Sequence, residues 1–436
     1  MRRSTQVFAV VAILATIAAG CAKKTPSTSG SSPSAASCTS NKLSGLAAAA
    51  ANHRATFTAA GVLAQTSSKP VVKLGMFGDL TGTASALVTP IRNAAKLAID
   101  QANASGKAID GTQLQTTIQL VVKDNKDHLA TTAPPIEQSF IDDSKVLGVI
   151  GGAFSGETDA VGAKFAAAGL THISASATLP TLTSHGWPFF RTVVPDSVQG
   201  AKLADVIAFT GCKTAAVIDD KEDYGKGLAD AVATELKAKG VTVAIRQAVD
   251  AKVTDYSTLI GTITAQKPDV IFYGGYYNSA ALLLKQLRER GNNTLFTCGD
   301  GCADKQLVTL ATAPDATNVF VTCPCTIPVF AAAGTKAAQL QSDYKAKFGI
   351  NALIYSAEAY DAANMFIAAI AHGGTTPTRA SVLAFIKAVN NFPGVSRDYT
   401  FQPNGELSTS SQTINVYPVK NGALELLGTT DKAMGH

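Results

Sequence analysis

The chain has 436 residues, of which 46% are hydrophobic and only 16% are charged, with a formal net charge of +5. This composition is typical of an ordered globular protein with large buried faces, and the part after Pro70 is too long for one core of usual size. Acidic and basic residues are interspersed without basic runs, which argues against nucleic acid as a partner.

The first 21 residues have the features of an export signal. Arg2 and Arg3 form a positively charged N-terminal region. Val7 to Ala19 form an apolar stretch that is too short to span a membrane as a mature helix. The small residues before Cys21 resemble a bacterial lipobox, although Ala18 stands where such motifs usually carry leucine. We therefore predict a lipoprotein signal peptide at residues 1–21, a lipidated Cys21 and an extracytoplasmic protein anchored to the cell membrane. A plain secretory signal with a chance cysteine is the alternative.

Residues 22–69 are predicted to be a flexible tether followed by an Ala-rich segment. Serine, threonine, proline and glycine dominate residues 22–41, which have almost nothing to bury. Residues 42–66 are rich in alanine and fit either a helix packed on the following domain or an extension of the tether.

Short β-branched runs alternate with helical stretches from Val71 to Cys323, which favours parallel sheets with crossover helices. There are more predicted strands than one doubly wound sheet of ordinary size needs, so two α/β lobes are the simpler interpretation. The predicted strands are Val71–Phe77, Thr117–Val122, Val146–Ile150, His172–Ala175, Phe190–Val194, Ala215–Ile218, Val241–Ile245, Val270–Tyr273 and Val319–Thr322.

Helices are predicted where apolar residues recur three and four apart. Those between the strands are Pro90–Ala104, Gly225–Lys239, Ser257–Ala265 and Ser279–Arg290. After Cys323 the predicted strands and helices no longer alternate. Three successive helices (Thr335–Phe348, Ser356–Ala371, Arg379–Val389) precede short strands at Tyr399–Gln402, Thr413–Val419 and Ala423–Leu427. A chain that leaves one lobe and comes back to the other would have this order.

One strand–loop–helix joint could hold an anion. The buried run Val146–Ile150 ends at two glycines that allow a sharp turn, and Ser155 stands where an N-cap would open a helix over Glu157–Ala168. The first turn of a helix offers unpaired N–H groups and a positive dipole end. The alternative is an ordinary strand–loop–helix connection with a serine N-cap and no ligand.

A series of segments, in one order and spacing, resembles the type I periplasmic binding proteins, close to the leucine/isoleucine/valine-binding branch of ABC importers. The segments include Val-Lys-Leu-Gly-Met-Phe-Gly-Asp-Leu-Thr-Gly at Val72–Gly82 and Asp-Asp-Lys-Glu-Asp-Tyr-Gly-Lys-Gly at Asp219–Gly227. The others are the loop within Val149–Thr158, Ile173–Pro180, Phe190–Thr192, Asp255–Ser257, Pro268–Tyr276 and Cys298–Gly301.

The resemblance implies an α/β fold of two Rossmann-like lobes with parallel sheets, joined by three hinge segments, with ligand in the cleft. The hinges fall near Thr192–Pro195, Thr322–Thr326 and Asp398–Phe401 by this mapping. The first lobe would take residues 71–194 and 325–398, and the second lobe residues 195–324 and 399–436.

The resemblance also implies an amino-acid site. Ser155 matches the serine that holds the ligand carboxylate, with Ser176 and Thr178 opposite, where the Ser176 carbonyl would accept from the ligand ammonium. Asp300 matches the acidic partner of the ammonium, which is a glutamate in the leucine-binding branch. Tyr224, Tyr276 and Tyr355 match residues that enclose the ligand. Leu87 and Phe154 depart from the family pattern, where tyrosine and cysteine are common, and both changes alter the side-chain pocket.

Six cysteines remain after Cys21, an even number that suggests disulfides outside the cytoplasm. We expect two bridges that join the pair Cys298 and Cys302 to the pair Cys323 and Cys325, because neighbours one residue apart are poorly placed to bond with each other. Cys38 and Cys212 are left as a third candidate pair. A four-thiolate zinc site is the rival, and its spacing fits poorly.

No catalytic, cofactor or metal motif stands out. The leading hypothesis is a lipid-anchored, monomeric receptor that captures a small amino acid or related zwitterion and delivers it to an ABC permease with its ATPase subunits. The alternative is a sensory or regulatory module of the same fold, with an amide, urea-like or aromatic acid ligand. An extracytoplasmic enzyme is the third, weakest hypothesis.

Overall fold

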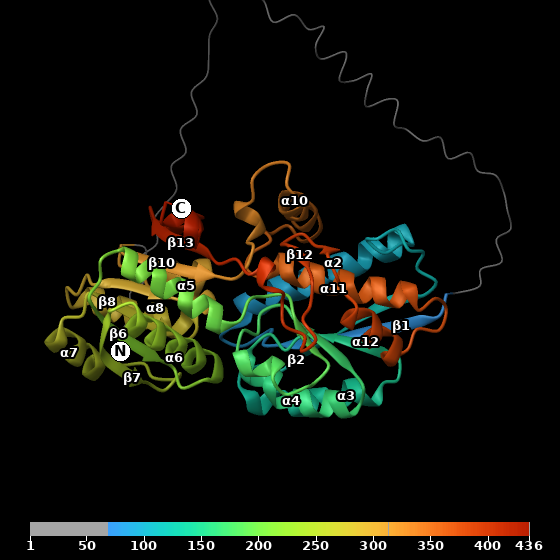
Figure 1. The fold of residues 1–436 in the computed structure, drawn as a ribbon, viewed down its shortest axis with the longest axis horizontal. Coiled ribbons are helices and arrows are strands. Elements are labelled where there is room, and N and C mark those ends of the chain that lie inside the picture. Colours follow the sequence, from blue (N-terminus) through green and yellow to red (C-terminus); the bar gives the residue numbers. More distant parts are fainter. Residues whose placement is uncertain (1–68, 313, 436) are drawn as a thin grey trace, which may run out of the picture. The chain divides into compact units, whose positions relative to one another are not determined.

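The computed structural model describes residues 69–312 and 314–435, so the predicted signal peptide, tether and Ala-rich segment lie outside the described residues, as do Cys21 and Cys38. No helix of this described part is long and apolar enough to cross a membrane. The described chain forms two α/β lobes, each built around its own sheet, which confirms the predicted fold class (Figure 1).

The first lobe is organised around a sheet of five parallel strands in the order β2-β1-β3-β4-β5. Every residue of β3 and β4 is buried, as expected for central parallel strands covered on both faces. The strands are β1 (Val71–Gly78), β2 (Thr117–Asp124), β3 (Val146–Ile150), β4 (Thr171–Ser174) and β5 (Phe189–Arg191).

Helices from both ends of the chain cover this sheet. Helices α2 and α11 pack against each other on one side of the sheet, and α3 and α4 lie on the other (Figure 1). The helices of this lobe are α2 (Ser85–Ser105), α3 (Pro134–Asp142), α4 (Ser155–Ala167), α10 (Lys336–Phe348), α11 (Ser356–His372) and α12 (Arg379–Lys387). Its shorter elements are η1 (Ala130–Thr132), η2 (Pro180–Thr183), η4 (Pro328–Phe330) and the paired strands β11 (Phe392–Pro393) and β12 (Asp398–Tyr399).

The second lobe has a mixed sheet along the path β14-β13-β10-β9-β8-β6-β7. The strands from β10 to β7 pair in parallel, whereas β13 pairs antiparallel with β10, β14 and β15. The strands are β6 (Thr214–Asp219), β7 (Thr242–Ala248), β8 (Val270–Gly274), β9 (Leu295–Cys298), β10 (Val319–Cys323), β13 (Asn415–Lys420), β14 (Ala423–Leu424) and β15 (Gly428–Thr429).

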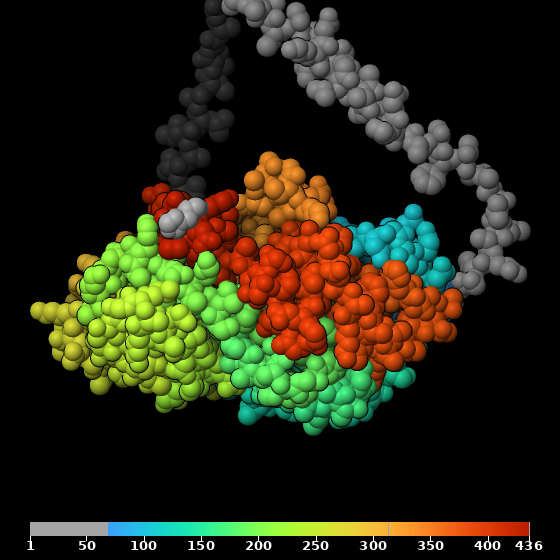
Figure 2. Space-filling view, in the orientation of Figure 1, coloured from blue at the N-terminus to red at the C-terminus, as the bar shows by residue number. Residues whose placement is uncertain are grey.

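Helices α5 and α6 pack together in this lobe, as do α8 and α9. The helices are α5 (Asp196–Phe209), α6 (Asp223–Ala238), α7 (Ser257–Gln266), α8 (Tyr277–Glu289), α9 (Lys305–Leu310) and α13 (Thr430–Ala433). The short turns are η3 (Asp300–Cys302) and η5 (Thr409–Ser411). The late segments, drawn in orange and red, lie over both lobes in Figure 2, because the chain returns to the second sheet at its end.

The chain crosses between the sheets three times. The first crossing follows β5 at residues 192–195, and the second follows β10 at residues 324–327. The third differs from the prediction. Residues 399–407, expected in the second lobe, contact the first: the Phe401 ring lies 5.1 Å from that of Phe190, and Glu406 bonds to Arg191. This crossing therefore comes after Leu407, nearer to β13.

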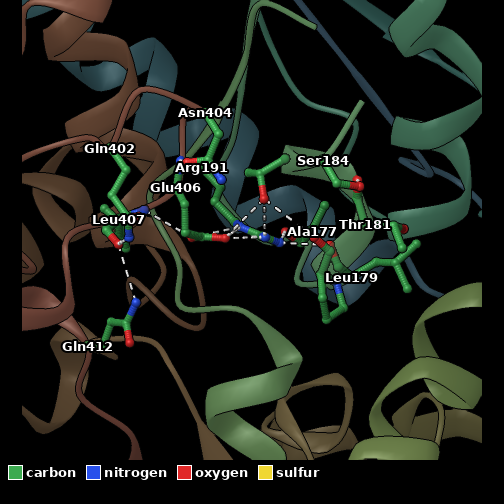
Figure 3. A network of polar contacts seen from close by, with 12 residues as sticks. Ala177, Leu179, Thr181, Ser184, Arg191, Gln402, Asn404, Glu406, Leu407 and Gln412 are labelled. Carbon is green, nitrogen blue, oxygen red and sulfur yellow. Dashed lines mark hydrogen bonds and ion pairs between the residues drawn. The ribbon is translucent and has the colours of Figure 1, made fainter. Parts of the chain in front are cut away.

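Arg191 joins β5 to this late segment (Figure 3). Its side chain is fully buried, and its Nε donates to both carboxylate oxygens of Glu406 at 3.0 Å. Its Nη1 donates to the backbone carbonyls of Leu179 (2.9 Å) and Ala177 (3.4 Å), in the loop after β4. One guanidinium thus joins β5, the loop after β4 and Glu406, which lies 215 positions away in the sequence.

Some predicted elements differ in extent or were missed. Helix α2 begins at Ser85 rather than at Pro90, which lies inside it, and α4 begins at Ser155, so that Ser155 is its first helical residue and not its N-cap. Helices α3 and α5 and strand β9 were not predicted. Helix α3 and strand β9 are short, with 9 and 4 residues, and the buried face of α5 begins with the polar or small residues Asp196, Gln199 and Gly200.

The cysteines pair differently from the expected cross-connection. Cys298 is bonded to Cys302, with Cα atoms 6.2 Å apart, and Cys323 is bonded to Cys325, with Cα atoms 5.1 Å apart. The turn η3 folds the chain back within the first pair, and the second pair lies where β10 ends, so each cysteine meets its near neighbour. Cys212 is buried without a cysteine partner among the described residues, and Cys38 lies outside them.

Candidate ligand-binding site

A cavity between the two lobes brings together six of the seven predicted site residues. Its empty volume is about 270 Å³, which includes space open to solvent. Four further residues, Leu87, Ile91, Ala153 and Phe154, complete its wall. The predicted residues that line it are Ser155, Ser176, Tyr224, Tyr276, Asp300 and Tyr355. Thr178 is absent from this wall.

The polar residues of the cavity follow the carboxyl ends of parallel strands. Ser155 follows β3 and Ser176 follows β4, while Tyr224, Tyr276 and Asp300 follow β6, β8 and β9. Strands β3 and β4 are neighbours in one sheet, and β6, β8 and β9 are neighbours in the other. Ligands of α/β sheets bind in this position, because the loops beyond neighbouring strand ends converge there.

The N-terminus of α4 forms the wall of the first lobe. The buried Glu157 carboxylate accepts from the backbone amides of Ala153 (2.5 Å) and Phe154 (3.0 Å), and Asn125 also donates to it. Burial raises the pKa of Glu157 to about 8, although these hydrogen bonds lower it. The Ser155 hydroxyl accepts from the amide of Leu179 at 3.2 Å, which leaves its own proton to donate. Its N–H, in the first turn of a 13-residue helix, has no intrahelical partner.

The loop after β4 supports this wall. The Ser176 hydroxyl donates to the carbonyl of Ala153 at 2.6 Å, so its side chain fixes the loop before α4. The carbonyl of Thr178 accepts from the amide of Asp196 at 2.9 Å, and the Thr178 hydroxyl is buried without a hydrogen-bond partner among the described residues. Thr178 therefore lies behind the cavity wall, toward the first hinge.

Asp300 is the acidic residue that the second lobe contributes to the cavity wall. It is 1% exposed and accepts hydrogen bonds from the hydroxyls of Tyr224, at 3.0 Å, and Tyr355. Burial raises its pKa, while the bonds from Tyr355 and Tyr224 lower it by less. Tyr355 comes from the first lobe and has a φ of 60°, a left-handed conformation that is rare for a bulky residue and typical of functional sites. The bond between Tyr355 and Asp300 therefore crosses the cleft.

Aromatic rings close the cavity. Tyr224 and Tyr276 stack with centroids 5.2 Å apart, and Phe154 meets Tyr276 edge-on at 5.1 Å. The His128 ring lies 5.1 Å from that of Tyr276, and its Nε2 lies 3.1 Å from the Glu222 carboxylate of the second lobe. Burial lowers the pKa of His128, but the contact with Glu222 and the charges of Asp127 and Asp79 raise it more. These contacts hold the lobes together at the mouth of the cleft.

Sequence reasoning missed two buried polar residues on α5, Asp196 and Gln199. Asp196, the first residue of α5, is fully buried, and its carboxylate oxygens have no hydrogen-bond partner among the described residues. The Gln199 amide donates to the Thr322 carbonyl at 3.1 Å and also lowers the pKa of Asp300. The only signal in the sequence was an acid placed directly after the predicted first hinge.

The described residues contain no group of three or more His, Cys, Asp or Glu side chains suited to a metal ion. The alternative zinc site at Cys298, Cys302, Cys323 and Cys325 is not formed, because these cysteines are bonded in pairs.

Comparison with known proteins agrees with the fold and the cleft. The family model described as "Periplasmic binding protein" matches residues 71–423. The Leu/Ile/Val-binding protein BraC3 of Rhizobium johnstonii is 27% identical over 81% of this chain and 93% of its own length. The leucine-, isoleucine-, valine-, threonine- and alanine-binding protein of Pseudomonas aeruginosa is 27% identical over 81% of this chain and 92% of its own.

Among solved structures, the branched-chain amino acid transporter substrate-binding protein LivJ of Streptococcus pneumoniae, in complex with isoleucine, matches with a TM-score of 0.72 and 26% identity. The match covers 82% of this chain and 99% of that one. A Rhodopseudomonas palustris solute-binding protein in complex with benzoate, covering 83% of this chain and 96% of its own, has a TM-score of 0.72 and 17% identity, and so shares the fold alone. The chain belongs to the periplasmic binding protein family, and it is an extracytoplasmic solute-binding protein rather than an enzyme.

Proposed function

We propose that this protein is a lipid-anchored, monomeric receptor that captures a small amino acid or related zwitterion between its lobes and delivers it to an ABC importer. One observation carries the proposal: the N-terminus of α4, with Ser155, and the buried carboxylate of Asp300 line the same cavity from opposite lobes. A helix N-terminus favours an anion, and a buried carboxylate favours a cation. A zwitterion satisfies both at once.

In the proposed complex the ligand carboxylate lies at the Ser155 amide and hydroxyl, and its ammonium group lies at Asp300 and the carbonyl of Ser176. The rings of Tyr224, Tyr276 and Phe154 and the side chains of Leu87 and Ile91 surround the rest of the ligand. The wall offers the ligand side chain apolar and aromatic contacts, so we expect an uncharged side chain. Two relatives are named as binding proteins for leucine, isoleucine and valine, which supports the same ligand class.

Closure of the lobes would signal that ligand is bound. Contacts that cross the cleft, such as the hydrogen bond from the Tyr277 hydroxyl to the Thr83 carbonyl at 2.7 Å, hold the closed arrangement. A ligand that touches both lobes stabilises that arrangement over an open one. The closed form would then dock on a permease served by cytoplasmic ATPase subunits, while the lipid on Cys21 keeps the receptor at the membrane.

A thermal-shift screen of the purified protein tests the ligand class. An amino acid at one hundred times its Kd should stabilise the protein by about 2.7 kcal/mol and raise its melting temperature. Asp300→Asn should abolish the shift, whereas Asp205→Asn, a change of a surface carboxylate on α5, should leave it unchanged. If no amino acid gives a shift, and an amide, a urea or an aromatic acid such as benzoate does, the sensory alternative replaces this proposal.

A further inference from the structure

The loop that carries Asp300 is closed by a disulfide. Its sequence is Cys-Gly-Asp-Gly-Cys, and the bond between Cys298 and Cys302 has Asp300 at the centre of the loop that it closes. Both cysteines are fully buried, and neither lines the cavity, whereas Asp300 does. The disulfide therefore lies behind the cavity wall, where it contacts the ligand only through Asp300.

The glycines on either side of Asp300 are required by close packing. A Cβ atom on Gly299 would lie 2.3 Å from the side chain of the buried Leu228. A Cβ atom on Gly301 would lie 2.5 Å from the backbone oxygen of Gly275. The loop therefore needs glycine at both positions, and glycine is the residue with the greatest backbone freedom.

This freedom opposes a well-defined position for Asp300. A charged group that binds a ligand must be held within about 0.5 Å of its working position. The Tyr224 hydroxyl helps, because it donates to the Asp300 carboxylate at 3.0 Å and accepts from the Gly301 amide at 2.9 Å. The bond from Tyr355 crosses the cleft, so it can form only when the lobes are closed. The disulfide lies within the second lobe and restrains the loop whether the lobes are open or closed.

We propose that Cys298 and Cys302 are positioning residues, whose disulfide holds the Asp300 carboxylate in the place where the ligand's ammonium group binds. The bond removes conformations that the loop would otherwise lose when the ligand binds, and a preorganised site binds its ligand more tightly. This inference rests on the proposed function, because Asp300 is the ammonium contact in that proposal.

The inference predicts a change in ligand preference. An α-keto acid has the carboxylate and carbon skeleton of the corresponding amino acid, but a carbonyl oxygen in place of the ammonium group, so it forms no ion pair with Asp300. Loss of the disulfide should weaken binding of the amino acid by about tenfold or more. Binding of the keto acid should stay within a factor of about three.

Titration calorimetry of the purified protein, well below its melting temperature, measures both dissociation constants. The probes are the amino acid with the largest thermal shift in a panel that includes L-leucine, L-isoleucine and L-valine, and the α-keto acid of the same skeleton. The variant is Cys298→Ala/Cys302→Ala. A second variant, Cys298→Val/Cys302→Ala, keeps more buried volume at the end of β9 and should show the same loss.

Cys323→Ala/Cys325→Ala is the matched control, because it removes the other disulfide of the described chain, whose cysteines do not line the cavity. It should leave the preference for the amino acid over the keto acid unchanged.

Two results would overturn the inference while the proposed function stands. In one, loss of the Cys298–Cys302 bond lowers the melting temperature but leaves the Kd of the amino acid unchanged. In the other, it weakens both ligands equally. Binding of no amino acid to the native protein would remove the proposed function and this inference together.

Discussion

Arg191→Met should be among the most destabilising single substitutions in this protein. The change leaves the Glu406 carboxylate, which is 8% exposed, without its partner, and it removes the donor to the carbonyls of Leu179 and Ala177. Breaking one side of a buried ion pair costs about 3–5 kcal/mol. Over roughly 370 described residues, an unfolding entropy of about 2.1 cal/mol/K per residue converts 4 kcal/mol into a fall of about 5 °C in melting temperature.

The double variant Arg191→Met/Glu406→Gln separates charge from packing. It leaves no unpaired charge. The carbonyls of Leu179 and Ala177 lose a donor, at about 1 kcal/mol each, and the Thr183 hydroxyl loses a longer contact of 3.4 Å. We therefore expect it to be more stable than Arg191→Met alone by about 2 kcal/mol in equilibrium urea unfolding at pH 7.

The exposed pair formed by Lys226 and Asp230 on α6 is the control, and Lys226→Met should cost less than about 0.5 kcal/mol. If Arg191→Met costs less than about 1 kcal/mol, or the double variant is as unstable as the two single changes added, the ion pair does not stabilise the fold as reasoned.

Three further outcomes are expected. Burial lowers the pKa of His128, but the contact with Glu222 and the charges of Asp127 and Asp79 together raise it more. These contacts therefore stabilise the folded protein fully below the unfolded pKa, and the effect is lost as pH rises through the folded pKa. His128→Gln should flatten this dependence in urea unfolding between pH 5.5 and 8.5, and an unchanged slope would contradict it. Gly274→Ala should cost about 3 kcal/mol, because its Cβ would lie 2.2 Å from a backbone oxygen, whereas Gly261→Ala, in an open helical site, should stabilise by up to about 1 kcal/mol. Cys21→Ser should move the protein from the membrane to the soluble extracytoplasmic fraction, and membrane retention in cell fractionation would argue against lipidation.

The amino-acid sequence determined the two-lobe α/β architecture and most of the cavity wall. Alternation of apolar strands and amphipathic helices is a local property, and the strand runs Val146–Ile150 and Val270–Tyr273 appear almost unchanged as β3 and β8. Ser155 and Tyr276 were assigned to the site through the resemblance to the binding-protein family, and they lie in the cavity wall because each follows the carboxyl end of a parallel strand. Short-range pattern and the order of segments suffice for such features.

The tertiary structure alone decided which distant groups meet. Glu406 lies 215 positions from Arg191, and no local pattern marks it as the partner that holds residues 399–407 on the first lobe. The cysteine pairing depended on the turn η3 and on the end of β10, and the burial of Asp196 depended on how α5 leaves the first hinge. Burial and charge contact are properties of the assembled chain, because water is excluded only after the lobes pack and close.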